Sequence, residues 1–254
     1  KSTEFVETVA NQNIHQAADI DFIIITHPDF APEAERLAAL HRSEYNQNVL
    51  VTNLRHISNE FSGGRQDPVA IREYIRMFYT RGLASGKPLE NVLLMGDGSY
   101  DFQNRVEENT NYIPTFQSRN TTDPVNSYSS DDFYAILDDS EGYYDLTLAA
   151  EDLDIGIGRI PCNSIAQAKI MVDKIVKYHD PSSHGDWQNT VTFLGDDEDG
   201  AIHLDDSETM SNYVKSQEPV FNINKIYLDA YEQKSFGSGE KYPDVNIAIT
   251  KALE

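Results

Sequence analysis

Two aspartates, Asp97 and Asp101, stand close together directly after an apolar run at 91–95. If that run is a buried strand, both side chains emerge at the carboxyl end of a sheet, which is where open α/β sheets bind their ligands. Carboxylate oxygens are the ligands that Ca²⁺ prefers, so the pair predicts a calcium site. A structural turn in which Asp97 accepts hydrogen bonds from local amides explains the same residues equally well.

A second acidic group, which begins with Asp196 and Asp197, follows another apolar run at 191–194. Carboxylates at a strand end can orient a cationic or imidazole group or bind a metal, and a solvated acidic loop is the alternative. His203 comes just after this group and before a predicted helix. The seven histidines of the sequence show no paired spacing of the kind that zinc sites use, so we expect no zinc site.

The one cysteine, Cys162, lies between a predicted strand and a predicted helix. A catalytic thiol needs an adjacent base, and no histidine lies near Cys162 in the sequence. A helix N-terminus alone lowers the pKa of a thiol only in part. We therefore interpret Cys162 as a small buried hydrophobe rather than a nucleophile. A single cysteine also excludes a disulfide within the chain.

The chain is strongly acidic: its 254 residues include 42 Asp and Glu against 20 Lys and Arg, which gives a formal net charge of −22. Such a surface repels phosphate backbones, so we expect no nucleic-acid partner. It suits divalent cations or cationic peptides, and the solubility of a secreted protein is the simpler reason for it. No apolar run has the length of a transmembrane helix, and we expect no transmembrane segment.

Apolar runs and segments of helical period alternate along the chain. Strands are predicted at 21–26, 49–52, 91–95, 133–137, 153–157, 191–194 and 224–228. Helices are predicted from Pro32, from Asp67, from Ile165, over 206–216 and after Pro243. This order predicts an α/β fold in three layers, in which 21–26, 49–52 and 91–95 form one parallel sheet with helices on both faces. Residues 99–130 lack a period, and a connection of that length is usually functional or mobile.

Several segments together resemble the gingipain family of cysteine peptidases. They are Leu93-Leu-Met-Gly-Asp97, Ser130-Asp-Asp-Phe-Tyr-Ala135, where the family has Gly in place of Ala135, and Ile157-Gly-Arg-Ile-Pro-Cys-Asn-Ser164 with Asp173 and Tyr178 downstream. The resemblance runs from about residue 21 to the end of the chain. It implies a caspase-like fold of two adjoining sheet-bearing subdomains. Residues 1–18 would then be a linker or preceding region, 19–160 the first subdomain, and 161–254 the start of the second, catalytic subdomain.

Within this family the chain is most similar to the type IX secretion sortases, the PorU-type signal peptidases of the bacterial cell surface. The long 99–130 insertion and the Asp-Asp-Phe-Tyr form of the second motif carry this likeness. It implies a cysteine endopeptidase with protein or peptide substrates, contact with secretion-system components, and a secreted, cell-surface or outer-membrane location. It implies no required cofactor, with Ca²⁺ as an optional ligand.

The resemblance also implies roles for single residues. The family's catalytic His and Cys are expected beyond Glu254, so the second subdomain is expected to be incomplete and the chain alone inactive. The acid that steadies the catalytic His falls at Asp196 or Asp197, and both carboxylates are expected to stay hydrated here. The acidic specificity residue of arginine-specific members falls near His203, which argues against arginine specificity. A non-catalytic, Ca²⁺-binding surface or adhesion module with the same fold is the alternative reading.

Overall fold

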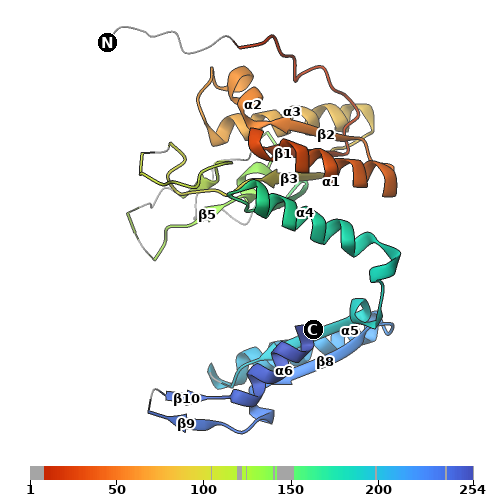
Figure 1. The fold of residues 1–254 in the computed structure, drawn as a ribbon, viewed down its shortest axis with the longest axis vertical. Coiled ribbons are helices and arrows are strands. Elements are labelled where there is room, and N and C mark those ends of the chain that lie inside the picture. The colour runs from red at the N-terminus through yellow and green to blue at the C-terminus, as the bar shows by residue number, and fades with distance from the viewer. Residues whose placement is uncertain are drawn as a thin grey trace. The chain divides into compact units, whose positions relative to one another are not determined.

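The computed structural model describes residues 9–253 apart from 104, 119–121, 124, 140, 142–151, 198 and 238 (Figure 1). The chain forms two compact units, Lys1–Lys177 and Tyr178–Glu254. The division falls near the end of helix α4 (Ile165–His179), which follows the last strand of the first unit. Each unit contains its own parallel strands.

The first unit is built on a four-stranded parallel sheet. Its strands are β1 (Phe22–Thr26), β2 (Val49–Asn53), β3 (Asn91–Met95) and β6 (Gly156–Ile160), in the order β2-β1-β3-β6. All five residues of β1 are buried, as expected for a β-branched run in the middle of a sheet that is covered on both faces. The prediction of one parallel sheet from 21–26, 49–52 and 91–95 is confirmed.

Helices cover both faces of this sheet (Figure 1). Ile23 and Ile25 of β1 pack with α2 (Leu54–Phe61) and α3 (Pro68–Ser85), whereas Phe22 and Ile24 pack with α1 (Ala31–Glu44) and α4. Successive side chains of a strand point to opposite faces, so a continuous apolar run supplies both layers of the core. The predicted three-layer arrangement, typical of caspase-like and gingipain-like folds, is confirmed.

Helices α2 and α3 begin at capping residues that the sequence displays. The Asp67 carboxylate accepts a hydrogen bond from the Val69 amide at 2.9 Å, and Asn53 caps α2 through the Arg55 amide at 2.8 Å. Helix α3 ends at Gly86, whose φ of 75° is the left-handed conformation that favours glycine. The eight-residue helix α2, which directly follows β2, was not predicted.

The predicted strand at 133–137 is wrong. A 3-10 turn occupies Asp132–Tyr134, and residues 133–137 are buried without pairing to a strand. Side chains of α3 replace the missing ladder: Arg72 Nε donates to the Ile136 carbonyl at 2.8 Å, and Arg76 Nε to the Leu137 carbonyl at 3.1 Å. In sequence, this buried apolar run looks like a strand. In the structure, its carbonyls accept hydrogen bonds from arginine side chains instead of from a neighbouring strand. The strand predicted at 153–157 begins later, as β6.

The insertion at 99–130 contains one small antiparallel pair, β4 (Phe116–Gln117) with β5 (Ser129–Ser130). Short 3-10 helices occur elsewhere, at Pro28–Phe30, Asp132–Tyr134, Pro181–Ser183, Asp186–Asn189, Asp199–Ala201 and Leu228–Ala230. Among the described residues, no helix has both the length and the apolar character needed to cross a membrane.

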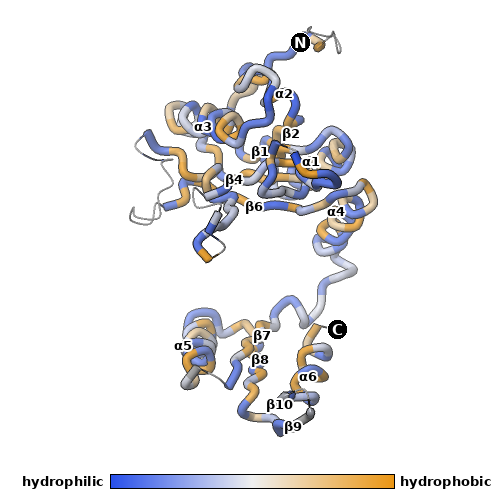
Figure 2. The backbone as a smooth tube through the Cα atoms, turned by 90° about the vertical axis from the view of Figure 1, so that its left-hand side faces the viewer, coloured by the Kyte–Doolittle hydropathy of each residue, from blue (hydrophilic) through white to orange (hydrophobic). Residues whose placement is uncertain are grey.

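The second unit has a two-stranded parallel sheet. Strands β7 (Thr190–Gly195) and β8 (Asn222–Tyr227) are joined by α5 (Ile202–Gln217), and Figure 2 shows them between α5 and α6 (Pro243–Leu253). A hairpin of β9 (Lys234–Phe236) and β10 (Gly239–Lys241) precedes α6. The predicted strands and helices of this region are confirmed, with α5 starting four residues earlier than expected.

Candidate functional site

The end of β3 is tied to the end of β6 at Gly96 and Asp97. The Asp97 amide donates to the Cys162 carbonyl at 2.9 Å, and the Asp97 carbonyl accepts from Tyr112 and Ile113 at 2.9 and 3.0 Å. Gly96 has a φ of 150°, and a Cβ atom there would lie 2.8 Å from Ile113 Cγ1. Only glycine fits this close approach, which explains the Leu-Leu-Met-Gly-Asp motif in structural terms.

The carboxylates of Asp97 and Asp101 are engaged with backbone amides of the following loop. Asp97 accepts from the Gly98 amide at 2.9 Å. Asp101, which is buried, accepts from the Val106 amide at 2.7 Å and from the Arg105 amide. In the part of the chain that the structure describes, Asp97 and Asp101 belong to no group of three potential metal ligands. The hydrogen bonds are those of the structural turn that the sequence analysis weighed against calcium.

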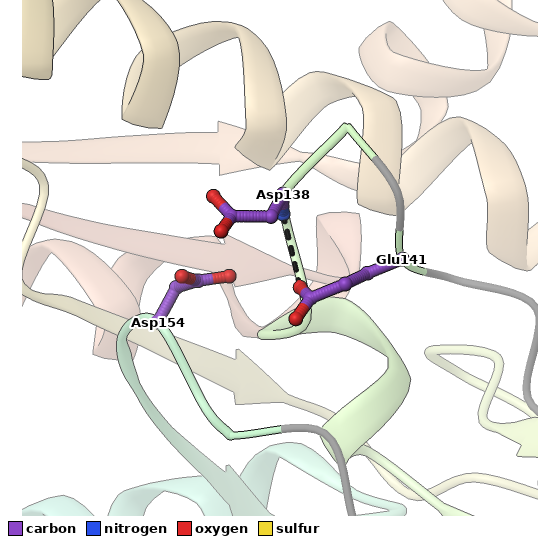
Figure 3. A group of neighbouring side chains, drawn as sticks. All are labelled: Asp138, Glu141 and Asp154. Carbon is purple, nitrogen blue, oxygen red and sulfur yellow. Dashed lines mark hydrogen bonds between the residues drawn. The ribbon is translucent and has the colours of Figure 1, made fainter. Parts of the chain in front are cut away.

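A group of three acids lies elsewhere, at Asp138, Glu141 and Asp154 (Figure 3). Their nearest carboxylate oxygens all lie within 4.8 Å of one another. Asp154 accepts from the Leu137 amide at 2.6 Å and from the Tyr79 hydroxyl at 2.9 Å, which holds it beside the other two. The sequence analysis missed the group because Asp154 is distant in the sequence. Asp138 is exposed, so water solvates the charge of its carboxylate without a bound ion.

Arg159 joins the ends of several segments through its guanidinium group. Nε and Nη2 each donate to one Asp131 carboxylate oxygen at 2.7 Å, and Nη1 donates to the carbonyls of Gly96 and Ile113 at 2.7 and 2.8 Å. The side chains of Arg159 and Asp131 are 13% and 22% exposed. Both residues lie in motifs that carry the family resemblance, and their role here is to hold β3, β6 and the 111–114 segment together.

Cys162 is buried, with 1% exposure, among the residues that pack α1 and α4 on the sheet. Burial, together with the nearby negative charge of Asp97, raises the pKa of the Cys162 thiol from 9.0 to about 11. A nucleophilic cysteine needs a depressed pKa and access to substrate. The interpretation of Cys162 as a small buried hydrophobe is confirmed.

We expect Cys162 to react with iodoacetamide about 100-fold more slowly in the folded chain than in the chain unfolded by guanidinium, both at pH 8, because the thiolate is the reactive form. Mass spectrometry of quenched samples measures the two rates. A raised folded-state pKa also means that the thiol's contribution to stability is complete below pH 9 and is lost as the pH rises through 11. Equal rates in the folded and unfolded chains would contradict this environment.

The second unit contains a surface pocket of about 480 Å³ at the carboxyl end of β7. It is lined by Leu194, Gly195, Asp196, His203, Asp206, Ser207, Leu228 and Ile249. The structure thus brings Asp196 and His203 together, as their places in the sequence suggested. Sequence reasoning did not single out Asp206, although its spacing of three residues from His203 on a helix places both on one face.

Two close contacts hold α5 against the end of β7. A Cβ atom at Gly195 would lie 3.0 Å from Leu204 Cα, so glycine permits this close approach of the helix. Ser207 Oγ donates to the Leu194 carbonyl at 2.6 Å. Both contacts lie at the strand–helix junction that forms the pocket, and they position the start of α5 relative to Asp196.

The two neighbouring aspartates have different surroundings. The Asp197 carboxylate accepts a hydrogen bond from the Tyr242 hydroxyl and Asp196 Oδ1 is shielded from water, so the expectation that both carboxylates stay hydrated is wrong for these oxygens. Asp196 Oδ1 is buried and has no hydrogen-bond partner among the described residues. An unpaired buried acceptor is costly, and a donor from outside the described part of the chain would satisfy it.

Comparisons with known proteins identify the family of this chain. The family model described as peptidase family C25 matches residues 15–254. The crystal structure of dimeric latent PorU from Porphyromonas gingivalis is similar to this chain, with 35% identity and a TM-score of 0.61 over 71% of the chain. A structure described as "Structure of Protease" matches at 14% identity and a TM-score of 0.47, over 73% of this chain and 34% of that one. No curated protein matches the chain.

The matched part of PorU is a small share of that protein, because the alignment covers 17% of the PorU chain. The family model, in contrast, covers nearly all of the present chain, including both units and the pocket at Asp196. The chain belongs to peptidase family C25, the gingipain family.

Proposed function

We propose that the protein that carries this chain is a cysteine endopeptidase of the type IX secretion sortase kind, which processes exported proteins at the bacterial surface. The observation that carries the proposal is the 35% identity with PorU over 71% of this chain. Protein substrates and contact with secretion-system components follow from the same likeness.

In such an enzyme a thiolate attacks the scissile carbonyl, a histidine acts as base, and an acid orients the histidine. Cys162 is buried with a raised pKa, so we propose that the nucleophile and its histidine come from outside these 254 residues. Asp196 is the better candidate for the orienting acid, because its buried Oδ1 still needs a donor. Asp197 already accepts from Tyr242.

The proposal is tested by comparing the peptidase activity of the 254-residue chain with that of the longer protein from the same gene. We expect no activity from the chain alone, and activity that a thiol-directed peptide inhibitor abolishes in the longer protein. Cys162→Ala in the longer protein should leave turnover within about twofold, because a small core substitution changes stability more than chemistry.

Three results would overturn the proposal. An inhibitor adduct on Cys162 would identify this residue as the nucleophile. Activity of the longer protein that is insensitive to thiol reagents would exclude a cysteine mechanism. A longer protein that binds Ca²⁺ and lacks peptidase activity would favour the alternative, a non-catalytic surface or adhesion module with the same fold.

A further inference from the structure

Residues 12–17, named the strap here, lie on the outer side of α2 before the chain enters β1 (Figure 1). Gln12, Ile14 and Ala17 are partly buried, while the residues between them are exposed. Ile14 and Ala17 pack at the margin of the core that covers one face of the sheet. The strap therefore contacts the folded unit through a few inward side chains only.

One carboxylate, that of Glu60 on α2, receives three polar contacts from the strap. Glu60 Oε1 accepts from Gln12 Nε2 at 2.9 Å and from the Ile14 amide at 3.1 Å. Glu60 Oε2 lies within hydrogen-bond distance of His15 Nδ1. The Glu60 side chain is 16% exposed, so these bonds are partly shielded from water.

Gln12 and His15 of the strap make further contacts with α2 and α3. Gln12 Nε2 also donates to the His56 carbonyl at 2.7 Å, and Gln12 Oε1 accepts from Asn59 at 3.2 Å. The His15 ring stacks on Phe61 with centroids 4.9 Å apart and an interplanar angle of 8°. Arg81 of α3 donates to the His15 carbonyl at 2.7 Å. Gln12 and His15 thus have specific partners on α2 and α3.

We propose that the strap is a docked segment that leaves α2 as a unit, and that Glu60 is the clasp that decides whether it is docked. The strap contributes no fully buried apolar side chain, so its separation from α2 exposes little core surface. Segments held mainly by hydrogen bonds open independently of the buried sheet. When the clasp opens, residues 12–17 are no longer held against the first unit.

The clasp depends on pH through Glu60. Burial acts to raise the pKa of Glu60, but hydrogen bonds from Ile14, Gln12 and His15 outweigh it and hold the pKa below its ordinary value. Docking is therefore favoured above the ordinary carboxyl pKa and is lost as the pH falls through the lowered value. The charge of His15 favours the carboxylate, and Tyr74 of α3 is the other titratable group that interacts with it.

Other charged or titratable groups contact the strap without replacing this carboxylate. Arg81 binds the His15 carbonyl, and His56 contributes a backbone oxygen to Gln12. His15 itself can donate from Nδ1 as a neutral tautomer or as a cation, so its hydrogen bond does not require a charge. Loss of the Glu60 charge is consequently the step that opens the clasp.

Hydrogen exchange of the whole chain, measured as protection of the strap amides and of the β1 amides, tests the proposal. Glu60→Gln should raise the exchange rate of the Ile14 amide at least about tenfold, because charge-assisted bonds are lost, and should leave β1 unchanged. The matched control is Glu35→Gln on α1, an exposed acid paired with Arg42, which should leave the strap protected.

A second variant separates the clasp from the integrity of α2. Gln12→Ala changes the strap alone, and it should also speed exchange at Ile14 while the unfolding midpoint of the chain stays the same. The wild-type strap should lose protection as the pH falls below the ordinary Glu pKa of 4.5, and the Glu60→Gln strap should show no such pH dependence. Equal strap protection in wild type, Glu60→Gln and Gln12→Ala would overturn the proposal, and so would strap opening that always accompanies unfolding of β1.

Discussion

Replacing Asp196 with Asn in the longer protein is expected to lower kcat by about 10² to 10⁴-fold, the range expected when the acid behind a catalytic histidine loses its charge. The asparagine keeps the shape of the side chain but carries no negative charge to stabilise an imidazolium, and its amide can donate as well as accept, so it no longer fixes one tautomer of the histidine. Asp196 lies at the carboxyl end of β7 in the pocket of the second unit, and its buried oxygen has no partner among the described residues. Steady-state kinetics with a peptide substrate measure the effect.

Two further variants make this result specific to Asp196. Asp197→Asn should change kcat much less, because Asp197 already accepts a hydrogen bond from Tyr242 and serves the structure of the unit. Asp205→Asn, an exposed acid on α5 that does not line the pocket, controls for the loss of one negative charge. Wild-type kcat in both Asp196→Asn and Asp197→Asn would remove both residues from the mechanism.

Replacing Arg159 with Met is expected to lower the free energy of unfolding of the first unit by about 3 kcal/mol, because the change leaves the shielded Asp131 carboxylate without its counter-charge. It also removes the donors to the carbonyls of Gly96 and Ile113. Methionine keeps much of the apolar volume, so the loss reports on the polar contacts rather than on a cavity. Urea unfolding followed by circular dichroism measures the change.

Arg36→Met is the matched comparison, since Arg36 likewise forms ion pairs, with Glu33 and Asp173, but its side chain is 37% exposed. We expect it to cost less than about 1 kcal/mol, as is usual for surface ion pairs. In an Arg159→Met, Asp131→Asn double variant the two losses should not add, because both changes break the same contact. Equal losses of unfolding free energy for Arg159→Met and Arg36→Met would show that the contacts of Arg159 contribute no more than those of a surface ion pair.

The central strands and their helices could be predicted because their signals are local. β1 is a continuous, mostly β-branched run that supplies side chains to both faces of the sheet. Asp67 followed by Pro68 is the N-cap and N1 pair that predicts the start of α3. The buried run at 133–137 has the same local signal, yet it is not a strand. Its backbone carbonyls are satisfied by Arg72 and Arg76 from α3, and no property of the run itself distinguishes that solution from a ladder.

In the candidate site, too, some features follow from the local sequence and others only from tertiary contacts. The sequence by itself determined that acidic residues follow β7 and that His203 opens the next helix, because a strand–helix junction is a local feature. Only the tertiary structure separated Asp196 from Asp197. Tyr242, 45 residues away in the chain, binds Asp197, whereas Asp196 Oδ1 has no partner among the described residues. Contacts between distant segments also decided the Arg159–Asp131 pair and the clasp at Glu60. Such pairs depend on where folding places two backbones, and local residue order contains no record of that placement.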